Sequence, residues 1–286
     1  MEIIQVLANG IVLGGLYACI AVGFSLVWGV LNIINMMHGS FIILGGYIAY
    51  FAFAHLGLHP YVMMPVAGAL MFVFGYILQR GIINHVITAP VLTTLTLTFG
   101  LDMIIYNFIT VVWSATPRRI TLDLGQVDLG GILMPVDRIS SFGLAFLLTG
   151  LLFLLLRTSR VGRAIVAVRM DRDAARLMGI RVNHIYAVTF GIGAFMAGAS
   201  GALMAVIFPV TPNLIPLFLG KAFVVCVIGG LGGVPGALVG GLALGLIESF
   251  AGHWLGPQHM MTTGFVLMLF LLLVKPTGLL GRKGYE

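Results

Sequence analysis

The sequence predicts an all-α protein, a polytopic bundle of eight or nine transmembrane helices with one long basic cytoplasmic loop. Hydrophobic residues fill 60% of the 286 positions and charged residues only 8%, whereas a soluble domain carries roughly 25% charged residues. Apolar runs recur along the chain, and several approach the ~20 residues that a helix needs to cross a bilayer. The segment 157–181 holds seven of the fifteen basic residues and two of the nine acids, so it carries a net charge of +5 out of +6.

Other classes of protein fit this composition poorly. A transmembrane β-barrel would show alternating segments of about ten residues, and that period is absent. The first apolar run follows acidic Glu2 and no basic residue, so we expect a membrane helix there rather than a cleaved signal peptide. Cys19 and Cys226 lie in apolar runs and are expected to behave as small buried hydrophobes. The basic residues lie beside membrane helices, which leaves no large soluble surface for nucleic acid.

The membrane segments can be delimited in order as one transmembrane domain over residues 1–286. They are residues 3–27, 40–56, 61–79, 90–113, 139–156, 184–208, 215–230, 236–252 and 259–275. The seventh is short enough to be re-entrant, and "GGLGGVPGALVGG" separates it from the eighth. The count therefore stays open, and nine crossings would place the N-terminus outside.

Basic residues in short loops indicate the orientation, because cytoplasmic loops are enriched in Lys and Arg. The loop 157–183 and the C-terminal tail are expected inside, and Arg80 agrees by alternation. The loop 114–138 carries three Arg and three Asp and falls outside. Within it, "TLDLGQVDLGGILMP" alternates and contains two adjacent glycines, which predicts a small hairpin.

The basic segment contains the signals of a short helix over about 173–178. Asp171 or Asp173 suits the N-cap, since a carboxylate accepts hydrogen bonds from free N–H groups and complements the helix dipole. Gly179 fits the position after the last turn. An arginine-rich helix with apolar residues, fixed between two membrane helices, is suited to docking another protein. A second interpretation treats the arginines only as anchors that hold the loop inside.

Several stretches resemble one known family. "GRAIVAVRMDRDAARLMGI" is similar to the coupling loop of ABC-importer permeases, in the form used by the branched-chain amino acid permease family, and "NIINMMHGSFIILGGYIAY" is similar to that family's N-terminal motif. "TFGLDMIIYNF", "ATPRRI" and "GKAFVVCVIGGLGGVPGALVGGLALGLIES" resemble it as well. The resemblance covers essentially the whole chain, and it is strongest to the LivH-type subunit.

The resemblance implies that the basic loop sits in a groove of a cytoplasmic ATPase, whose closure would move the membrane segments on either side. The residues implied in this coupling are Arg163, Arg169, Asp171, Arg172, Asp173, Arg176, Leu177, Met178 and Gly179. The implied partners are a second, LivM-type permease, two ABC ATPases and a periplasmic substrate-binding protein, in the bacterial cytoplasmic (inner) membrane. A homodimer stays open, since some related importers use one.

The chain shows no chemistry of its own, so we predict a transport subunit and not an enzyme. "GKAF" at 220–223 has Ile215 where the first glycine of a phosphate-binding loop belongs and Ala222 where Ser or Thr should hold magnesium. ATP and Mg²⁺ are therefore expected only in the partner ATPases, with no cofactor in this chain. No His, Cys and carboxylate cluster has the spacing of metal ligands, and no catalytic residue is predicted.

Polar residues in the stretch 28–39 and just beyond it are the first candidates for the substrate pathway, since such groups are costly inside a membrane. They are Asn32, Asn35, His38 and Ser40. A broken helix exposes backbone groups at membrane depth only where it lines a cavity or is buried in protein. These side chains could contact a zwitterionic substrate, or they could form an ordinary polar turn at the cytoplasmic surface.

A polar stripe on the fourth segment is the second candidate. Thr94, Thr98 and Asp102 follow one another at spacings of four residues, so they share one helix face. They could line the pathway, or they could form interhelical hydrogen bonds of perhaps ~1 kcal/mol each.

Small residues predict close helix packing at two places. Gly241 and Gly245 share a face with Glu248, for which Lys221 is a candidate partner. Glycines at this spacing let another helix approach closely. Ala194, Ala197, Gly198 and Gly201 have similar spacing, and the contact could be to the partner permease or to helices of this chain.

The leading hypothesis is the membrane permease of an ABC importer for branched-chain or related hydrophobic amino acids. The substrate class rests on the resemblance, and urea, short amides or aromatic and other organic acids remain alternatives. A stand-alone secondary transporter would not need the basic loop, and only Asp102 and Glu248 offer it carboxylates for proton coupling. Nothing specific favours an intramembrane enzyme.

Overall fold

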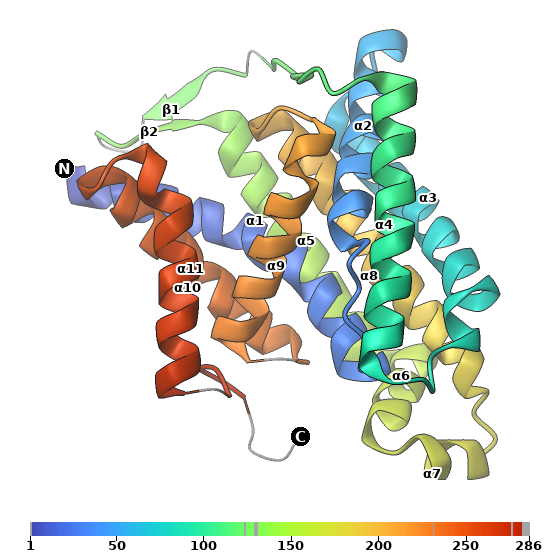
Figure 1. The fold of residues 1–286 in the computed structure, drawn as a ribbon. Helices are drawn as coiled ribbons and strands as arrows, with labels where there is room; N and C mark the ends of the chain where they lie inside the picture. The colour runs from blue at the N-terminus through green and yellow to red at the C-terminus, as the bar shows by residue number, and fades with distance from the viewer. Residues whose placement is uncertain (1, 123, 129–130, 231, 276, 282–286) are drawn as a thin grey trace.

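The computed structural model describes residues 2–122, 124–128, 131–230, 232–275 and 277–281. Within these ranges, nine helices are long and apolar enough to cross a membrane, which confirms the polytopic all-α fold (Figure 1). The spanning helices are α1 (Glu2–Leu31), α2 (His38–Leu56), α3 (Pro60–Gly81), α4 (Val91–Trp113), α5 (Val136–Thr158), α8 (Val182–Ile207), α9 (Ile215–Gly229), α10 (Val234–Trp254) and α11 (Met260–Val274). The other elements are η1 (Ile83–His85), β1 (Gln126–Asp128), β2 (Leu133–Pro135), α6 (Arg160–Met170), α7 (Arg172–Leu177), η2 (Pro212–Leu214) and η3 (Pro257–His259).

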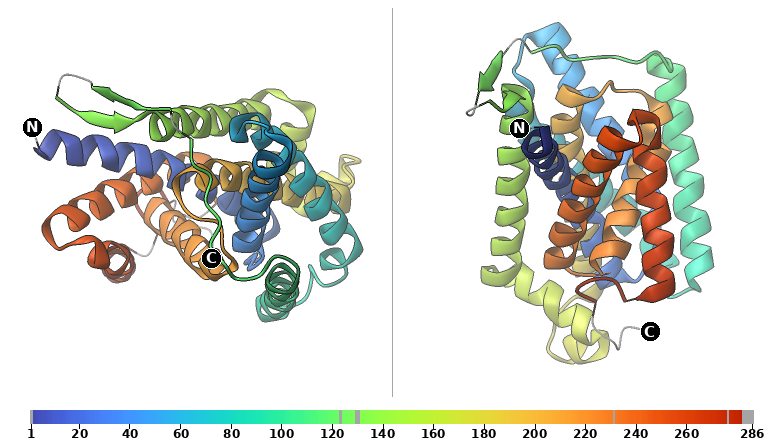
Figure 2. Two further views of the ribbon diagram at one scale, coloured as in Figure 1. Left: turned by 90° about the horizontal axis from the view of Figure 1, so that it is seen from above. Right: turned by 90° about the vertical axis from the view of Figure 1, so that its left-hand side faces the viewer.

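The two ends of the bundle differ in character. The strands β1 and β2 pair antiparallel, with Val127 opposite Met134, and form the expected hairpin; the Gly130 of its turn lies outside the described residues. The hairpin and the N-terminus lie at one end, and α6 and α7 lie at the other (Figure 2). We call these the hairpin end and the basic end. The short seventh segment, α9, descends from the hairpin end toward the basic end (Figure 1).

The connection between α1 and α2 differs from the expected polar stretch 28–39. Residues 28–31 continue α1, and the helix ends where Asn32 takes a left-handed φ of 55°, a conformation that Asn tolerates better than most residues. The chain then rises without helical structure and starts α2 at His38, well inside the bundle (Figure 1). Ile33, Asn35 and Met37 are buried along this rise. The broken segment is therefore shorter than expected, over 32–37, and beyond the exposed Asn32 it is buried or half-buried.

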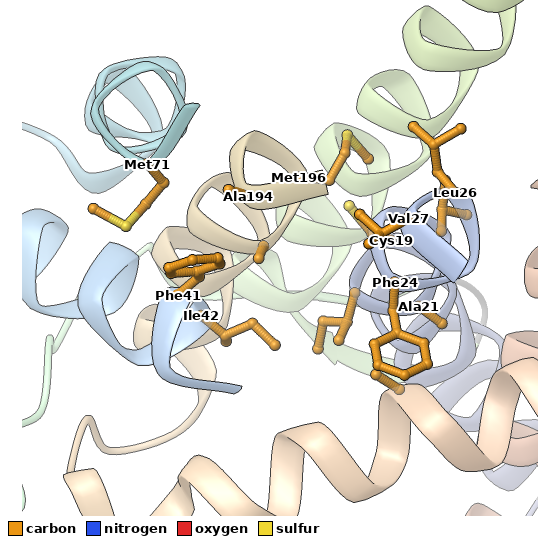
Figure 3. Close-up of a cluster of buried hydrophobic side chains, with 14 of the residues drawn as sticks. Cys19, Ala21, Phe24, Leu26, Val27, Phe41, Ile42, Met71, Ala194 and Met196 are labelled. Carbon is orange, nitrogen blue, oxygen red and sulfur yellow. The ribbon is translucent and has the colours of Figure 1, made fainter. Parts of the chain in front are cut away.

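The core lies around α1 and α8, whose central residues are buried on nearly all sides. A helix that is apolar all round belongs in the interior of a bundle. Figure 3 shows side chains from α1, α2, α3 and α8 meeting there. Phe41 of α2 contacts Phe190 of α8 edge to face, with ring centroids 6.1 Å apart. By contrast, α4 and α11 are mostly exposed and present apolar side chains outward, as helices at the edge of a membrane bundle do.

Small residues allow α8 to approach its neighbours closely. A Cβ added at Gly198 would lie 2.5 Å from Cγ of Met71 on α3, and one added at Gly75 would lie 2.6 Å from Cβ of Ala194. Gly201 lies against the backbone of Ile42 on α2. The small-residue face of α8 therefore packs against helices of this chain.

The glycine face of α10 packs in the same way against α1. A Cβ added at Gly241 would lie 2.5 Å from N and 2.6 Å from Cα of Ala18, and Gly245 lies against Gly14. Without side chains at these positions, the two helix backbones come into direct contact.

Gly241→Ala is therefore expected to destabilise the protein by about 1–3 kcal/mol, because overpacking forces the two backbones apart. The matched control is Gly150→Ala on α5, where an added Cβ meets nothing within 4 Å and alanine favours the helix. Unfolding in detergent, followed by circular dichroism, measures both. Equal stability of the two variants would contradict this account of the α1–α10 contact.

Candidate functional site: the basic end and the buried polar clusters

The basic segment folds into two helices, where the sequence analysis expected only a short helix at 173–178. The additional helix, α6, begins at Ser159, whose hydroxyl accepts a hydrogen bond from Gly162 N at 2.8 Å. Ile165 and Val168 are buried on its inner face, while Arg163 is exposed and Arg169 is half-buried. The expectation missed α6 because its apolar residues are few and its arginines are typical of a loop.

The second helix, α7, carries the caps expected from the sequence. Asp171 is the N-cap, and its Oδ1 accepts from Asp173 N at 2.8 Å and Ala174 N at 3.0 Å. At the other end Gly179 has φ of 80°. Its N–H donates to Arg176 O at 2.9 Å, and Ile180 N donates to Ala175 O at 3.0 Å. This pair of bonds is the Schellman motif, which glycine accommodates best.

The tip of the basic end is apolar and fully accessible. Leu177 is 89% exposed, Met178 is 83% exposed and Met170 is 79% exposed. Arg172 and Arg176 are exposed on the same short helix, and the ion pair of Arg176 with Asp173, at 3.2 Å, is exposed as well. An apolar knob with a charged rim, held on a doubly capped helix, has the composition of a protein-docking surface.

Two of the arginines implied in coupling contact other parts of this chain. Arg163 donates from Nη1 to Thr158 O at 2.8 Å, which ties α6 to the end of α5. Arg169 lies against the α9–α10 connection, where a Cβ added at Gly232 would be 3.4 Å from its Nη2. A displacement of α6 would therefore act through Arg169 on the connection between α9 and α10.

The structure gathers part of the expected pathway set into one buried cluster between α2 and α4. Ser40 Oγ donates to Asp102 Oδ1, and both residues are buried. Thr98 Oγ1 donates to Ile34 O at 3.0 Å and accepts a hydrogen bond from Met36 N at 3.4 Å. The polar stripe on α4 thus supplies hydrogen-bond partners for the irregular backbone at 32–37. Non-helical backbone inside a membrane bundle needs such partners.

The remaining members of that set have local or different contacts. Asn35 Oδ1 accepts from Met37 N at 3.1 Å. His38 Nε2 lies 2.9 Å from Ile20 O on α1, so it must be the donor. Thr94 donates to Val91 O at 2.9 Å on its own helix, and Asn32 is exposed at the end of α1. None of these contacts by itself distinguishes a pathway from helix-to-helix bonding.

Asp102→Leu is expected to lower the free energy of unfolding by about 1–3 kcal/mol, because it leaves the buried Ser40 hydroxyl without its acceptor. Asp102→Asn keeps an acceptor and should cost less. Asn107→Leu, an exposed position on the same helix, is the control and should be near neutral. Thermal unfolding in detergent compares the three, and a transport assay of the Asp102→Leu protein separates the roles: unchanged transport would remove Asp102 from the pathway.

A second buried cluster joins α1, α9 and α10. Lys221 Nζ lies 2.7 Å from Oε1 and 2.6 Å from Oε2 of Glu248. Lys221, the candidate partner of Glu248, therefore forms an ion pair with it. Tyr17 completes the cluster: its hydroxyl donates to Glu248 Oε2 at 2.8 Å and accepts from Lys221 Nζ at 2.7 Å. All three residues are buried. The sequence analysis missed Tyr17, because nothing in the sequence relates it to residues more than 200 positions away.

Over the described ranges, no group of three or more His, Cys, Asp or Glu side chains is placed to hold a metal ion. The arrangement is that of a helical bundle with buried polar contacts and an exposed apolar tip at one end.

Comparison with known proteins places this architecture in a family. The sequence pattern described as "Branched-chain amino acid transport system / permease component" matches residues 6–274. The high-affinity branched-chain amino acid transport system permease protein BraD of Pseudomonas aeruginosa is 33% identical, with 99% of this chain and 97% of the relative covered. The corresponding protein LivH of Salmonella typhimurium is 31% identical over the same shares.

A more distant relative is the corresponding permease protein LivM of Escherichia coli, 24% identical over 93% of this chain and 68% of the relative. No solved structure matches the chain. The match to the family pattern spans nearly the whole chain, and so do the alignments with BraD and LivH. The chain therefore belongs to the family of permease components of branched-chain amino acid transport systems.

Proposed function

We propose that this chain is one of two permease subunits of an ABC importer that carries branched-chain amino acids across the bacterial cytoplasmic membrane. Its partners are a second, LivM-type permease, two cytoplasmic ATPases that bind ATP and Mg²⁺, and a periplasmic substrate-binding protein. The basic end faces the cytoplasm, since arginine-rich loops stay inside, and the hairpin end faces outward. This chain itself holds no cofactor.

The observation that carries the proposal is the exposed tip of α7. Leu177 and Met178 are apolar side chains exposed at the end of the bundle, on a short helix held by caps on both sides. Arginines that serve only as anchors to hold the loop inside need neither an apolar tip nor a Schellman turn beside them. A partner on the cytoplasmic side that covers these side chains accounts for both features, and an ATPase groove is the partner that the family resemblance implies.

The substrate is supported by the relatives, which are named as branched-chain amino acid permeases. Urea, short amides and organic acids are tested as alternatives, and the likeness to LivM supports a heterodimer of two related permeases. In such a complex ATP hydrolysis supplies the energy, and this chain converts movement at the basic end into opening of the pathway.

The test is to express the chain with the products of its neighbouring genes, purify the complex through this chain and reconstitute it in nanodiscs. ATPase activity is then measured with the binding protein and leucine, isoleucine, valine, phenylalanine or urea. We expect ATPase subunits to copurify and the branched-chain amino acids to stimulate hydrolysis.

Stimulation by urea or phenylalanine alone would overturn the substrate class and keep the importer. A purified chain with no ATPase subunit and no stimulation by any compound would overturn the ABC assignment and favour the secondary transporter.

A further inference from the structure

A cavity of about 750 Å³ opens at the hairpin end, within the range of roughly 300–1,000 Å³ that is common for small-molecule sites. One face of α1 forms its longest wall, from Glu2 to Leu16. At a rise of 1.5 Å per residue these positions span about 21 Å along the helix. The cavity therefore extends along α1 from the exposed Glu2 to the buried Leu16.

The wall changes character along its depth. Glu2 and Asn9 of α1, Arg138 at the start of α5 and His253 near the end of α10 bring polar groups to it. Farther along α1 the lining residues are Val12, Leu13 and Leu16, joined by Ile207 and Phe208 from the end of α8. Such a space suits a molecule with a charged head and an apolar side chain.

Some polar side chains of the outer part have partners in the protein and others do not. Gln5 Nε2 donates to Leu133 O at 2.9 Å and Ser249 Oγ donates to Val6 O at 2.7 Å. Among the described residues, the side chains of Glu2, Asn9, Arg138 and His253 make no hydrogen bond or ion pair, and Glu2, Arg138 and His253 are exposed; the ion pairs found there are Asp173–Arg176 and Lys221–Glu248. A carboxylate and a guanidinium thus line one cavity without neutralising each other.

We propose that this cavity is the outward-facing binding site through which a zwitterionic amino acid enters the permease, with Arg138 receiving its carboxylate, Glu2 its ammonium group and the apolar inner wall its side chain. The assignment rests on the proposed function for its substrate class and orientation. Charge-assisted contacts of this kind are the stronger hydrogen bonds in proteins. A ligand that carries both charges can satisfy both groups at once, which neither a carboxylic acid nor an amine can do.

The site also differs from the residues that the sequence singled out. Ser40, Thr98 and Asp102 are engaged between α2 and α4, and Asn35 accepts from Met37 N of its own segment. None of these four residues lines the cavity, and neither does the Tyr17, Lys221 and Glu248 cluster.

The experiment uses the whole complex in membrane vesicles that expose the hairpin end. The variant Asn9→Cys places a thiol in the cavity wall, and a membrane-impermeant maleimide measures its accessibility. The native Cys19 and Cys226 are buried, so the unsubstituted chain gives the background. Labelling rates are recorded against leucine, against leucinamide, which lacks the carboxylate, and against 4-methylpentanoate, which lacks the ammonium group.

We expect leucine to slow the labelling of Asn9→Cys, and the other two compounds to require at least about tenfold higher concentrations, the factor that corresponds to losing one good contact. Adding Arg138→Gln should weaken protection by leucine to a similar degree, as should Glu2→Gln. Arg119→Gln, an exposed arginine of the same outer loop that does not line the cavity, is the matched control and should leave protection unchanged.

A thiol at position 9 that does not react from outside, or that reacts equally with and without leucine, would overturn the site. Equal protection by leucine, leucinamide and 4-methylpentanoate would overturn the roles of Glu2 and Arg138. Uptake of leucine by the unsubstituted complex is measured in parallel: uptake without protection refutes this site alone, while protection without ATP-driven uptake refutes the proposed function and supports the site.

Discussion

Gly179→Val is expected to abolish ATP-driven uptake while the chain still inserts into the membrane. Gly179 has φ of 80°, and an added Cβ meets nothing within 4 Å, so the effect arises from the backbone alone. A β-branched residue is a rare outlier at positive φ, and the strain is of order 1–3 kcal/mol. The turn that closes α7 would open, and Leu177 and Met178 would lose their fixed positions at the tip.

The control for this prediction is Gly179→Asn, since asparagine tolerates the left-handed region and should retain most of the uptake. Uptake of leucine and stimulated ATP hydrolysis are measured together in proteoliposomes, and copurification reports on assembly. If Gly179→Val shows normal stimulation and normal uptake, α7 is not the coupling element.

Charge reversal at Arg172 and Arg176 tests the rim of the same surface. The double variant Arg172→Glu, Arg176→Glu should uncouple hydrolysis from uptake as well, because a groove that receives arginines must complement them with acidic groups, which would repel the two glutamates. Arg119→Glu, at the opposite end of the molecule, controls for the change in net charge. Uptake at the level of that control would contradict a role for the two arginines.

Breaking the buried ion pair is expected to give the largest loss of stability. Lys221→Met leaves the Glu248 carboxylate buried with only Tyr17 as a donor, and Glu248→Leu leaves the Lys221 ammonium with only the Tyr17 hydroxyl and ring, whose centroid is 4.3 Å from Nζ. Removing one partner of a buried pair typically costs about 3–5 kcal/mol, because an uncompensated charge remains.

The double variant Lys221→Met, Glu248→Leu removes both charges and should be more stable than either single variant, since an apolar replacement of a buried pair is often nearly neutral. Tyr17→Phe removes only a hydroxyl and should cost about 1 kcal/mol. Thermal unfolding in detergent completes the double-mutant cycle. Additive losses from the two single substitutions would show that the pair is not coupled.

Local features of the chain were predictable because neighbouring residues determine them. The apolar runs marked the spanning helices to within a few residues, and Asp171 and Gly179 marked the limits of α7, since caps act on N–H and C=O groups within one turn. The exception is α6, whose single apolar stripe is short and whose inner face is recognisable only once α1, α5 and α8 surround it.

The sequence by itself thus determined that this is a membrane bundle, the limits of its spanning helices to within a few residues, and which family it resembles. Only the tertiary structure decided that Asp102 meets Ser40, that Tyr17 joins Lys221 and Glu248, and that Glu2 and Arg138 line one cavity. The physical reason is that a helix in a membrane has no polar, solvent-facing side, and the difference between polar and apolar faces is what pattern analysis uses. Lipid and protein interior are equally apolar, so hydropathy shows which residues leave water but not which helix face meets which partner.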